Sequence, residues 1–517
     1  MKRIETPLHP WLFAAYPPVA VAAGNFGQVS PGSVFVAVLT VWVVLGLLAP
    51  VVGHLCGSRA GSALLLSLLV AVFFCYGNVH TEIELLARRA IVSGAERWGG
   101  LLLKAGHLWL SGAALLVLLM ALLAILRLPG LSSPRLSGAL NVAGLFLLGA
   151  ASIQAGYAWS RSTGDLAPTP AAASTPVGGT VSALGYNPDI YHIVLDGYAR
   201  ADVLRDYYGH DNDPFLEALR ERGFWVSEGS RVNYNWTFLS LTSVLNFDYL
   251  HSLLPGALSP DHNERGPIYQ ALRNNRAAHF LRKRGYRIVH LKSSWSGTVE
   301  NPFADDEISC DGSLFENEYF RAITEISWLK VMESAETADL AACHLGRLQA
   351  LGAQAQRPGP KFVFAHFVPP HHPYLFDSQG KVLRHATIAN QFDTQARLWE
   401  RRDAYLEQLK FVNRTMIELV DRLSAESSRP PVIIIQSDHG PGLSEGLTPD
   451  EWLHVRFANL LALHLPEAPP ELIPSTASPV NLYRYLFNHY FEAKLPLLPE
   501  RSFVSSYGRP YAFQEVR

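Results

Sequence analysis

Three apolar segments of the sequence end on side chains that can bind a metal or move a proton. The segment "YHIVLD" ends on Asp196, "KFVFAHF" carries His366 near its end, and "PVIIIQSDHG" ends on Asp438, His439 and a glycine. A lone Asp-His-Gly sequence is more typical of a turn than of a ligand set, but here acids and imidazoles follow several apolar segments. Carboxylate and imidazole groups together favour a divalent cation such as Zn²⁺ or Mn²⁺. The pattern therefore predicts a metal site.

A reaction at such a site needs a nucleophile, and Thr237 is the candidate. In "NYNWTFLSLTSVLN" the apolar residues recur at helical spacing after Thr237, so this threonine is predicted to lie at a helix N-terminus. Free backbone N–H groups and the helix dipole favour an anion there, and metal coordination activates a hydroxyl. The alternative is that Thr237 only caps the helix. Ser240 and Thr242 are competing nucleophiles.

The segments that position these residues belong to an alternating pattern of strands and helices. Short apolar runs predict strands at 189–196, 286–291, 361–367, 431–437 and 459–465. Strands that alternate with helices predict an α/β domain with a mostly parallel sheet flanked by helices. Functional sites in such sheets gather at the carboxyl ends of the strands. We therefore assign residues 185–517 to one catalytic domain.

The preceding part of the chain is predicted to be an α-helical membrane domain, residues 1–160. A transmembrane helix needs about 20 mostly apolar residues. Segments that meet this requirement are 33–55, 62–79, 107–126 and 138–159. A weaker fifth segment, 7–26, is interrupted by Pro17 and Pro18. Residues 161–184 are rich in Pro, Ala, Ser, Thr and Gly, a composition that predicts a flexible linker.

Charge distribution bears on orientation and on partners. Residues 1–157 carry 9 Lys/Arg and 4 Asp/Glu, and the remaining 360 residues carry 34 Lys/Arg and 41 Asp/Glu. Neither part is basic enough to predict nucleic-acid binding. Five spans with Lys2 and Arg3 inside place 185–517 outside the cytoplasm, although the basic 80–105 loop then violates the positive-inside rule. A cleaved signal peptide leads to the same side. Only a first segment that lies on the membrane surface would place the catalytic domain in the cytoplasm.

The cysteines allow one cross-link. Cys310 and Cys343 are the only cysteines outside residues 1–160, the predicted membrane domain. An oxidising compartment allows such a pair to form a disulfide. The alternative is two buried thiols.

The ordered motifs resemble the alkaline phosphatase/sulfatase superfamily. In chain order, between about 190 and 465, they are "IVLDGYARADVL", "NYNWTFLSLTSVLN", "FAHFVPPHHPY", "YLEQLKFVNRTM" and "IIIQSDHGPG". Their order and spacing are similar to the sulfatase-like branch that includes lipoteichoic acid synthases and membrane phosphoethanolamine transferases. The resemblance implies a multi-pass protein of the bacterial inner (cytoplasmic) membrane, with an extracytoplasmic catalytic domain attached to about five membrane helices.

The resemblance also implies roles for individual residues. Asp196, Asp438 and His439 match the metal ligands of the family, and Thr237 matches its metal-bound nucleophile. The implied metal is Zn or Mn, with Mg or Ca as alternatives. Residues that match substrate-contacting or further metal-site positions are His366, His371 and His372, with His454 and Arg456 as weaker candidates. The alternative interpretation of "HHP" is a solvated turn, and that of the arginine is a surface ion pair.

The sequence departs from the family in one motif, and this departure disfavours one class of reaction. Sulfatases of the formylglycine type need Cys or Ser in a C-x-P-x-R context, and the nearest match here, "CHLGR" at 343–347, lacks the proline. A threonine nucleophile instead favours phosphoryl chemistry. The resemblance then implies transfer of a phosphoglycerol or phosphoethanolamine head group from a membrane lipid or glycolipid donor to an envelope glycan acceptor. The alternatives are a hydrolase of phosphate or sulfate esters and a non-catalytic envelope assembly protein.

Overall fold

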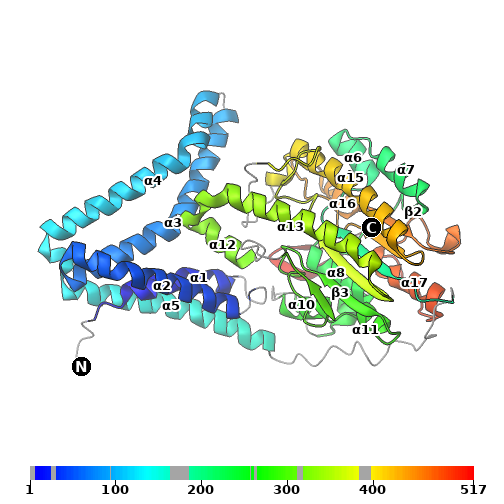
Figure 1. Ribbon diagram of the computed structural model, residues 1–517, viewed down its shortest axis with the longest axis horizontal. Coiled ribbons are helices and arrows are strands. Elements are labelled where there is room, and N and C mark those ends of the chain that lie inside the picture. Colours follow the sequence, from blue (N-terminus) through cyan, green and yellow to red (C-terminus); the bar gives the residue numbers. More distant parts are fainter. Residues whose placement is uncertain are drawn as a thin grey trace. The chain divides into compact units, whose positions relative to one another are not determined.

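The chain forms two compact units, Met1–Gly164 with Glu318–Glu333, and Asp165–Asn317 with Ser334–Arg517 (Figure 1). The computed structural model describes residues 6–24, 29, 31–92, 95–163, 185–256, 258–260, 265–310, 318–383 and 397–516. The predicted linker, 161–184, lies almost entirely outside the described residues.

The first unit is helical. Its helices are α1 (His9–Gly24), α2 (Pro31–Cys56), α3 (Arg59–Val92), α4 (Glu96–Arg127) and α5 (Pro134–Thr163), followed much later in the chain by α12 (Glu318–Ile326) and the short η3 (Trp328–Met332). Among the described residues, four helices are long and apolar enough to cross a membrane, at Pro31–Cys56, Arg59–Glu84, Ala105–Arg127 and Pro134–Gly156.

The weaker fifth span is not among these four. Its segment does form a helix, α1, which continues through Pro17 and Pro18 but has only 16 residues. At 1.5 Å per residue it is about 24 Å long, shorter than the hydrocarbon core of about 30 Å. Helix α1 is therefore not one of the four full-length candidate spans among the described residues, and a fifth span stays a prediction.

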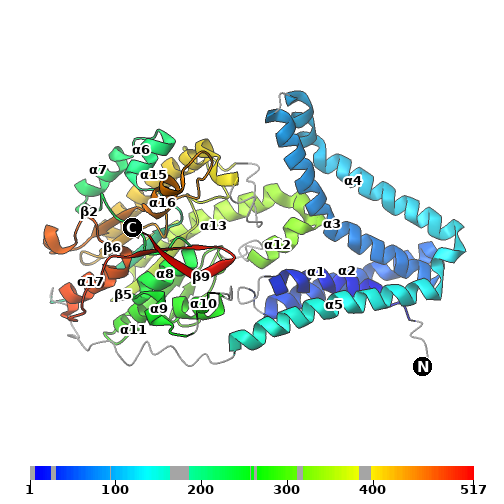
Figure 2. The ribbon, with the colours of Figure 1, turned by 180° about the vertical axis from the view of Figure 1, so that it is seen from behind.

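Helix α1 nevertheless packs inside the helical unit. The backbone N–H groups of Leu8 and His9 both donate to Asn141 Oδ1 on α5, each over 2.8 Å. Leu12 and Phe13 then lie against Gly144, one turn further along α5. The two helices thus run side by side in the same direction (Figure 1 and Figure 2). It follows that α1 begins and α5 ends at opposite ends of the unit.

The segment Glu318–Glu333 belongs to the helical unit, although the sequence predicts that it lies in the 185–517 domain. Tyr319 donates to the Pro18 carbonyl over 3.0 Å, and Lys330 donates to Thr81 Oγ1 over 2.7 Å. A glycine permits this packing, because a Cβ at Gly77 would lie 1.8 Å from the Glu325 carbonyl oxygen. Contacts with residues that are distant in the sequence therefore determine the position of this segment.

The second unit contains a sheet of seven strands in the order β2-β7-β6-β1-β5-β3-β4. The strands are β1 (Ile190–Leu195), β2 (Phe224–Val226), β3 (Arg287–Leu291), β4 (Asp306–Ile308), β5 (Lys361–Phe367), β6 (Val432–Gln436) and β7 (Leu461–His464). All pairings are parallel except those of β7 with β6 and β2. The predicted mostly parallel sheet is confirmed. A separate hairpin joins β8 (Ser502–Ser506) to β9 (Arg509–Val516).

Helices cover both faces of this sheet, which explains why its strands are apolar throughout. On β1, Ile190 and Val194 face one core, whereas Tyr191 and Ile193 face the other. The first core includes residues of α8 (Thr237–Asn246), α10 (Gly266–Arg273), α11 (Arg276–Arg282) and α17 (Leu482–Phe491). The second includes residues of α6 (Ala201–Tyr208), α7 (Asp213–Glu221), α13 (Glu333–Ala353) and α15 (Arg402–Glu426). Among the described residues of the unit, the other α-helices are α9 (Leu250–Leu253) and α16 (Pro449–Phe457).

The strand register brings the candidate residues to one edge. Strand β1 lies between β5 and β6, and its Val194 is the register partner of both His366 and Gln436. Asp196 follows β1, and Asp438 lies two residues beyond the end of β6. The carboxyl ends of three neighbouring strands therefore meet.

Cys310 and Cys343 form a disulfide, whereas Cys56 and Cys75 are free. Thiol counting on the unfolded protein should find two free thiols before reduction and four afterwards. Four free thiols without reductant would contradict the disulfide.

Candidate metal centre and active site

Two buried carboxylates form the centre of the site. Asp196 is 4% exposed and Asp438 is fully buried. Asp438 Oδ1 accepts a hydrogen bond from the backbone N–H of Gly197 over 3.0 Å. Burial, followed by the charge of Asp196, raises the pKa of Asp438 to about 7. Burial likewise raises the pKa of Asp196. Two adjacent ionised carboxylates in such an environment need a positive partner.

His439 completes a group that fits a metal ion. Its Nδ1 lies 2.8 Å from the Gly440 carbonyl and donates to it, so Nε2 presents a lone pair. That nitrogen lies 3.1 Å from Asp438 Oδ2 and 3.7 Å from Asp196 Oδ1. Within the described part of the chain, these two buried oxygens make no hydrogen bond. One ligand atom from each residue lies within 4.8 Å of the other two, an arrangement that suits a divalent cation.

Thr237 is placed beside this group. It is the first residue of α8, whereas the N-cap position belongs to Trp236, so the hydroxyl does not cap the helix. Thr237 Oγ1 instead lies 3.0 Å from His439 Nε2. The competing hydroxyls lie deeper in α8: Ser240 is 1% exposed, and Thr242 donates to the Phe238 carbonyl over 2.6 Å. Of the three, the structure brings only Thr237 to the predicted ligands.

Arg456 supplies positive charge from α16. It is 5% exposed, and it donates to the carbonyls of Gly440 over 3.0 Å and Asn235 over 2.9 Å. Burial lowers the pKa of Arg456 to about 10, so the guanidinium stays protonated at neutral pH. The alternative interpretation, a surface ion pair, is wrong for Arg456 but describes His454, which is 43% exposed and lies 3.0 Å from Asp202.

The three remaining histidines lie at the same edge. His366 Nε2 is 3.3 Å from Asp196 Oδ2, and its Nδ1 is 2.9 Å from Thr298 Oγ1. The backbone N–H of His371 donates to the Asp196 carbonyl over 3.1 Å. His372 is 3% exposed, so "HHP" is not a solvated turn. Burial lowers the pKa of all three imidazoles, that of His366 to about 4.

Two residues that position the histidine loop were not predicted. The Gln408 amide donates to the His371 carbonyl over 2.9 Å and accepts from Leu375 N–H over 2.6 Å. The Trp399 ring packs against both His371 and His372, with centroids 4.7 and 5.4 Å apart. The signal for Gln408 is its place on the apolar stripe of α15, where a buried polar side chain needs partners.

These groups can support attack by the Thr237 hydroxyl on an ester of an oxoacid, such as a phosphate or sulfate ester. A hydroxyl, two unpaired carboxylate oxygens and an imidazole lone pair converge, and a buried guanidinium lies nearby. A cation held by the carboxylates and His439 would favour ionisation of the Thr237 hydroxyl and polarise an ester oxygen.

The chain matches one protein family and is similar to several solved structures. A family model described as Sulfatase matches residues 188–468. Among solved structures, the chain is similar to the C-terminal periplasmic domain of EcEptC from Escherichia coli, at 13% identity and a TM-score of 0.40, covering 65% of this chain and 94% of that chain. For the same domain in complex with Zn, the identity is 13% and the TM-score 0.41, and the match covers 66% of this chain and 96% of that chain. For the C-terminal periplasmic domain of phosphoethanolamine transferase EptC from Campylobacter jejuni, the identity is 11% and the TM-score 0.35, and the match covers 59% of this chain and 89% of that chain. No curated protein sequence matches the chain.

Proposed function

This chain belongs to the sulfatase family, and we propose that it is a membrane-anchored, metal-dependent phosphotransferase. The observation that carries the proposal is the Thr237 hydroxyl, 3.0 Å from His439 Nε2 and beside the two unpaired carboxylate oxygens. A threonine at this place cannot become the formylglycine that many sulfatases use, so phosphorus is the favoured electrophile. Family membership supports an enzyme of phosphate or sulfate esters.

The first half-reaction forms a phospho-threonine. Thr237 Oγ attacks phosphorus, the bond from phosphorus to the leaving alkoxide breaks, and the hydroxyl proton passes to solvent. The leaving alkoxide takes a proton from His366 or His372. Burial lowers the pKa of both imidazoles, and the negative charge of a bound phosphate would favour their protonated form. Arg456 offsets the charge that develops on the phosphoryl oxygens.

The second half-reaction regenerates the enzyme. A hydroxyl of an acceptor attacks the phospho-threonine, and the bond from phosphorus to Thr237 Oγ breaks. The acceptor proton returns to the same imidazole, and Thr237 Oγ takes a proton back from solvent. A glycan hydroxyl makes the protein a transferase, and water makes it a hydrolase. Asp196, Asp438 and His439 would hold the cation, with Zn or Mn as the favoured metal.

The membrane helices support a lipid donor. In the described part of the chain, four helices are long and apolar enough to cross a bilayer, so the catalytic unit is tethered where lipid head groups are concentrated. We propose a phosphoglycerol or phosphoethanolamine lipid as donor and an envelope glycan as acceptor. The proposed location is the bacterial inner membrane, with the catalytic unit outside the cytoplasm.

Diacylglycerol release tests this function. Full-length protein supplied with Zn²⁺ and phosphatidylethanolamine or phosphatidylglycerol vesicles should release diacylglycerol when an envelope glycan acceptor is present. Release at the same rate without any acceptor would identify a hydrolase. No release from either lipid, with or without acceptor, would count against a lipid donor.

Topology provides a separate prediction. Because α1 and α5 run in the same direction, the chain before α1 and the chain after α5 emerge at opposite ends of the helical unit. With Lys2 and Arg3 in the cytoplasm, residues after α5 should lie outside. A reporter that is active only in the periplasm, fused after residue 165, should therefore be active. An inactive fusion, together with an active cytoplasmic reporter at the same position, would contradict this orientation.

A further inference from the structure

The loop that follows β3 holds two hydroxyl groups in line with the His366 ring. Thr298 Oγ1 lies 2.9 Å from His366 Nδ1, and Ser293 Oγ lies 2.7 Å from Thr298 Oγ1. The backbone N–H of Trp295 donates to Ser293 Oγ over 3.0 Å. The nitrogen of His366 that faces away from the predicted metal centre is therefore bound by side chains to which no role has been assigned.

The directions of these hydrogen bonds follow from the available partners. Ser293 Oγ accepts from the Trp295 N–H, and its own proton has two possible acceptors. The Thr298 hydroxyl lies 2.7 Å away, whereas the Trp295 carbonyl lies 3.5 Å away, beyond the usual range of an O–H···O bond. Ser293 therefore donates to Thr298. The Thr298 proton then goes to His366 Nδ1, the other partner of this hydroxyl besides Ser293 among the described residues.

This chain of hydroxyls determines which nitrogen of His366 carries the proton. A nitrogen that accepts from Thr298 presents a lone pair, so the proton of the neutral imidazole lies on Nε2. Nε2 lies 3.3 Å from Asp196 Oδ2, and a carboxylate on this side favours the same tautomer. Within the described part of the chain, Nε2 makes no hydrogen bond. His366 thus places an uncommitted N–H group beside the predicted metal centre.

His439 has the opposite tautomer. Its Nδ1 donates to the Gly440 carbonyl over 2.8 Å, so its Nε2 presents a lone pair that can bind a cation. The group that faces Nδ1 therefore separates two imidazoles of one site, a carbonyl for the ligand His439 and a hydroxyl for His366.

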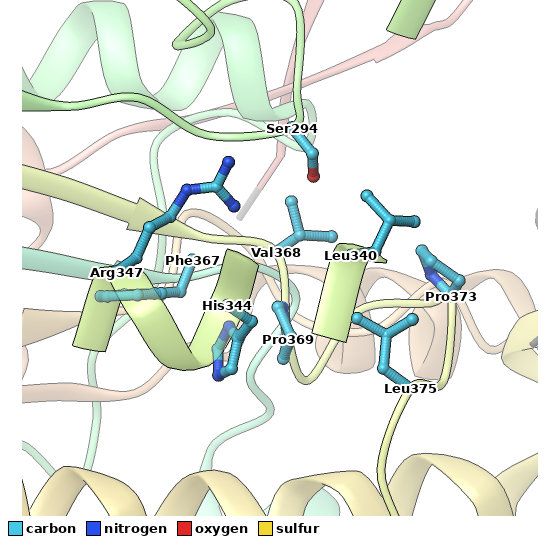
Figure 3. A pocket seen from close by; sticks show the side chains of 9 residues that line it. All are labelled: Ser294, Leu340, His344, Arg347, Phe367, Val368, Pro369, Pro373 and Leu375. Atoms are coloured by element: carbon cyan, nitrogen blue, oxygen red, sulfur yellow. The ribbon is translucent and has the colours of Figure 1, made fainter. Parts of the chain in front are cut away.

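Packing holds the loop against the end of β5. The Trp295 ring packs edge-on against the His366 imidazole, with centroids 5.4 Å apart. Ser294 and Val368 line the same small pocket, and Figure 3 shows the Ser294 side chain pointing toward Val368. The loop therefore contacts both His366 and the residues that follow it.

The backbone of Thr298 is fixed on both sides. Its N–H donates to the Trp295 carbonyl over 3.0 Å, and its carbonyl accepts from Ser293 N–H over 3.1 Å and from His290 Nε2 over 2.8 Å. Thr298 is 1% exposed. Its hydroxyl is thus held in place before any substrate binds.

From this geometry we propose that Thr298, oriented by Ser293, is a positioning residue that keeps the His366 proton on Nε2 and makes His366 a hydrogen-bond donor to a phosphoryl oxygen instead of a metal ligand. Loss of its one ring proton would leave an anionic ring, so His372 is the proton source for the leaving alkoxide. The proposal rests on the proposed function, since it assumes a phosphoryl group at the predicted metal centre.

Nitrogen NMR tests the tautomer without turnover. Full-length protein labelled with ¹⁵N-histidine is supplied with Zn²⁺ in lipid bilayers, and the His366 signals are those that disappear in His366→Gln. We expect a protonated Nε2 and an unprotonated Nδ1 that accepts a hydrogen bond. Thr298→Val should shift the Nδ1 signal because the donor is lost, Thr298→Ser should keep it, and Ser293→Ala should shift it less.

A buried threonine elsewhere provides the control. Thr324 is 5% exposed, and its hydroxyl donates to the Phe320 carbonyl over 3.1 Å. Thr324→Val should leave the His366 signals unchanged. A proton on Nδ1, an Nε2 bound to Zn²⁺, or an Nδ1 signal that neither Thr298→Val nor Ser293→Ala moves would overturn the proposal.

Orthophosphate binding tests the donor role. Calorimetry on the full-length protein with Zn²⁺ should show that His366→Leu weakens orthophosphate binding about tenfold or more, because a hydrogen bond to a charged group is lost. His366→Gln should lose clearly less, since its amide N–H can donate but cannot transfer a proton. Equal losses in the two variants would contradict the donor role.

The two measurements separate this proposal from the proposed function. No orthophosphate binding by the wild-type protein would count against the phosphoryl site and the donor role together. The assignment of Thr298 as the group that sets the His366 tautomer would still be supported by a protonated Nε2 and by the shift in Thr298→Val.

Discussion

Replacing Thr237 by alanine should lower turnover on the order of 10³-fold or more, because the variant loses the proposed nucleophile. Such a loss corresponds to about 4 kcal/mol of activation free energy. The fold should persist, since Thr237 is the first residue of α8 and does not cap it. The metal should also be retained, because Asp196, Asp438 and His439 are unchanged. Diacylglycerol release with the glycan acceptor, measured beside metal content and the melting temperature, checks all three expectations.

Neighbouring hydroxyls provide the controls. Ser240→Ala alters a hydroxyl that is buried one turn further along α8, and it should leave turnover within a few-fold of wild type. Thr237→Ser restores a hydroxyl at the same position and should recover part of the activity. Near-normal turnover of Thr237→Ala, or a larger loss in Ser240→Ala, would show that the nucleophile is misassigned.

Replacing Asp438 by alanine should remove the metal and the activity together. Asp438 is fully buried, and its Oδ2 lies 3.1 Å from His439 Nε2 without a hydrogen bond among the described residues. Removing this carboxylate deletes one of the predicted ligands, and Asp196 and His439, even with the Thr237 hydroxyl, should hold a cation poorly. Metal analysis of the purified variant should find well under one equivalent, whereas Thr237→Ala should match wild type.

A conservative control separates charge from shape. Asp438→Asn keeps the volume and keeps an oxygen that can accept from the Gly197 N–H, but it loses the negative charge. It should therefore fold like wild type and still bind metal weakly. Full metal content in Asp438→Ala, or full activity in a metal-free preparation, would contradict the assignment of Asp438 as a ligand.

The edge of the sheet could be predicted from the sequence because it depends on local pattern. A run such as "PVIIIQS" predicts a buried strand, which the structure shows as β6. Because β6 is a neighbour of β1 in the sheet, Asp438, which follows β6, lies beside Asp196, which follows β1. The structure places Thr237 and the predicted ligands together at this edge. Their roles remain predictions, because they depend on a metal and a substrate.

Features that depend on distant contacts could not be predicted in this way. The position of Glu318–Glu333 in the helical unit depends on a glycine at position 77. Any other residue type would place its Cβ against the Glu325 carbonyl. Gln408 fixes the histidine loop through several hydrogen bonds to backbone groups of that loop. Only its place on an apolar stripe indicates that role in the sequence.

The segment "CHLGR" shows how tertiary structure changes the meaning of a motif. In the sequence it is an imperfect match to a formylglycine signature. In the structure, Cys343 is joined to Cys310, and Arg347 is a buried residue of α13. The same five residues thus contribute a cross-link, which the position of the cysteines in the sequence allowed, and a buried cation, which the motif did not predict.

Peptide-mapping mass spectrometry of the covalent intermediate tests the proposed chemistry most directly. Full-length protein is incubated with Zn²⁺ and phosphatidylethanolamine vesicles without a glycan acceptor, quenched in acid and digested; a second sample receives phosphatidylglycerol. One of the two lipids should leave its phosphate-linked head group on Thr237, and no adduct should form in protein from which the metal was removed beforehand. An adduct on Ser240 or Thr242, or no adduct from either lipid while diacylglycerol is released, would contradict a phospho-threonine intermediate at Thr237.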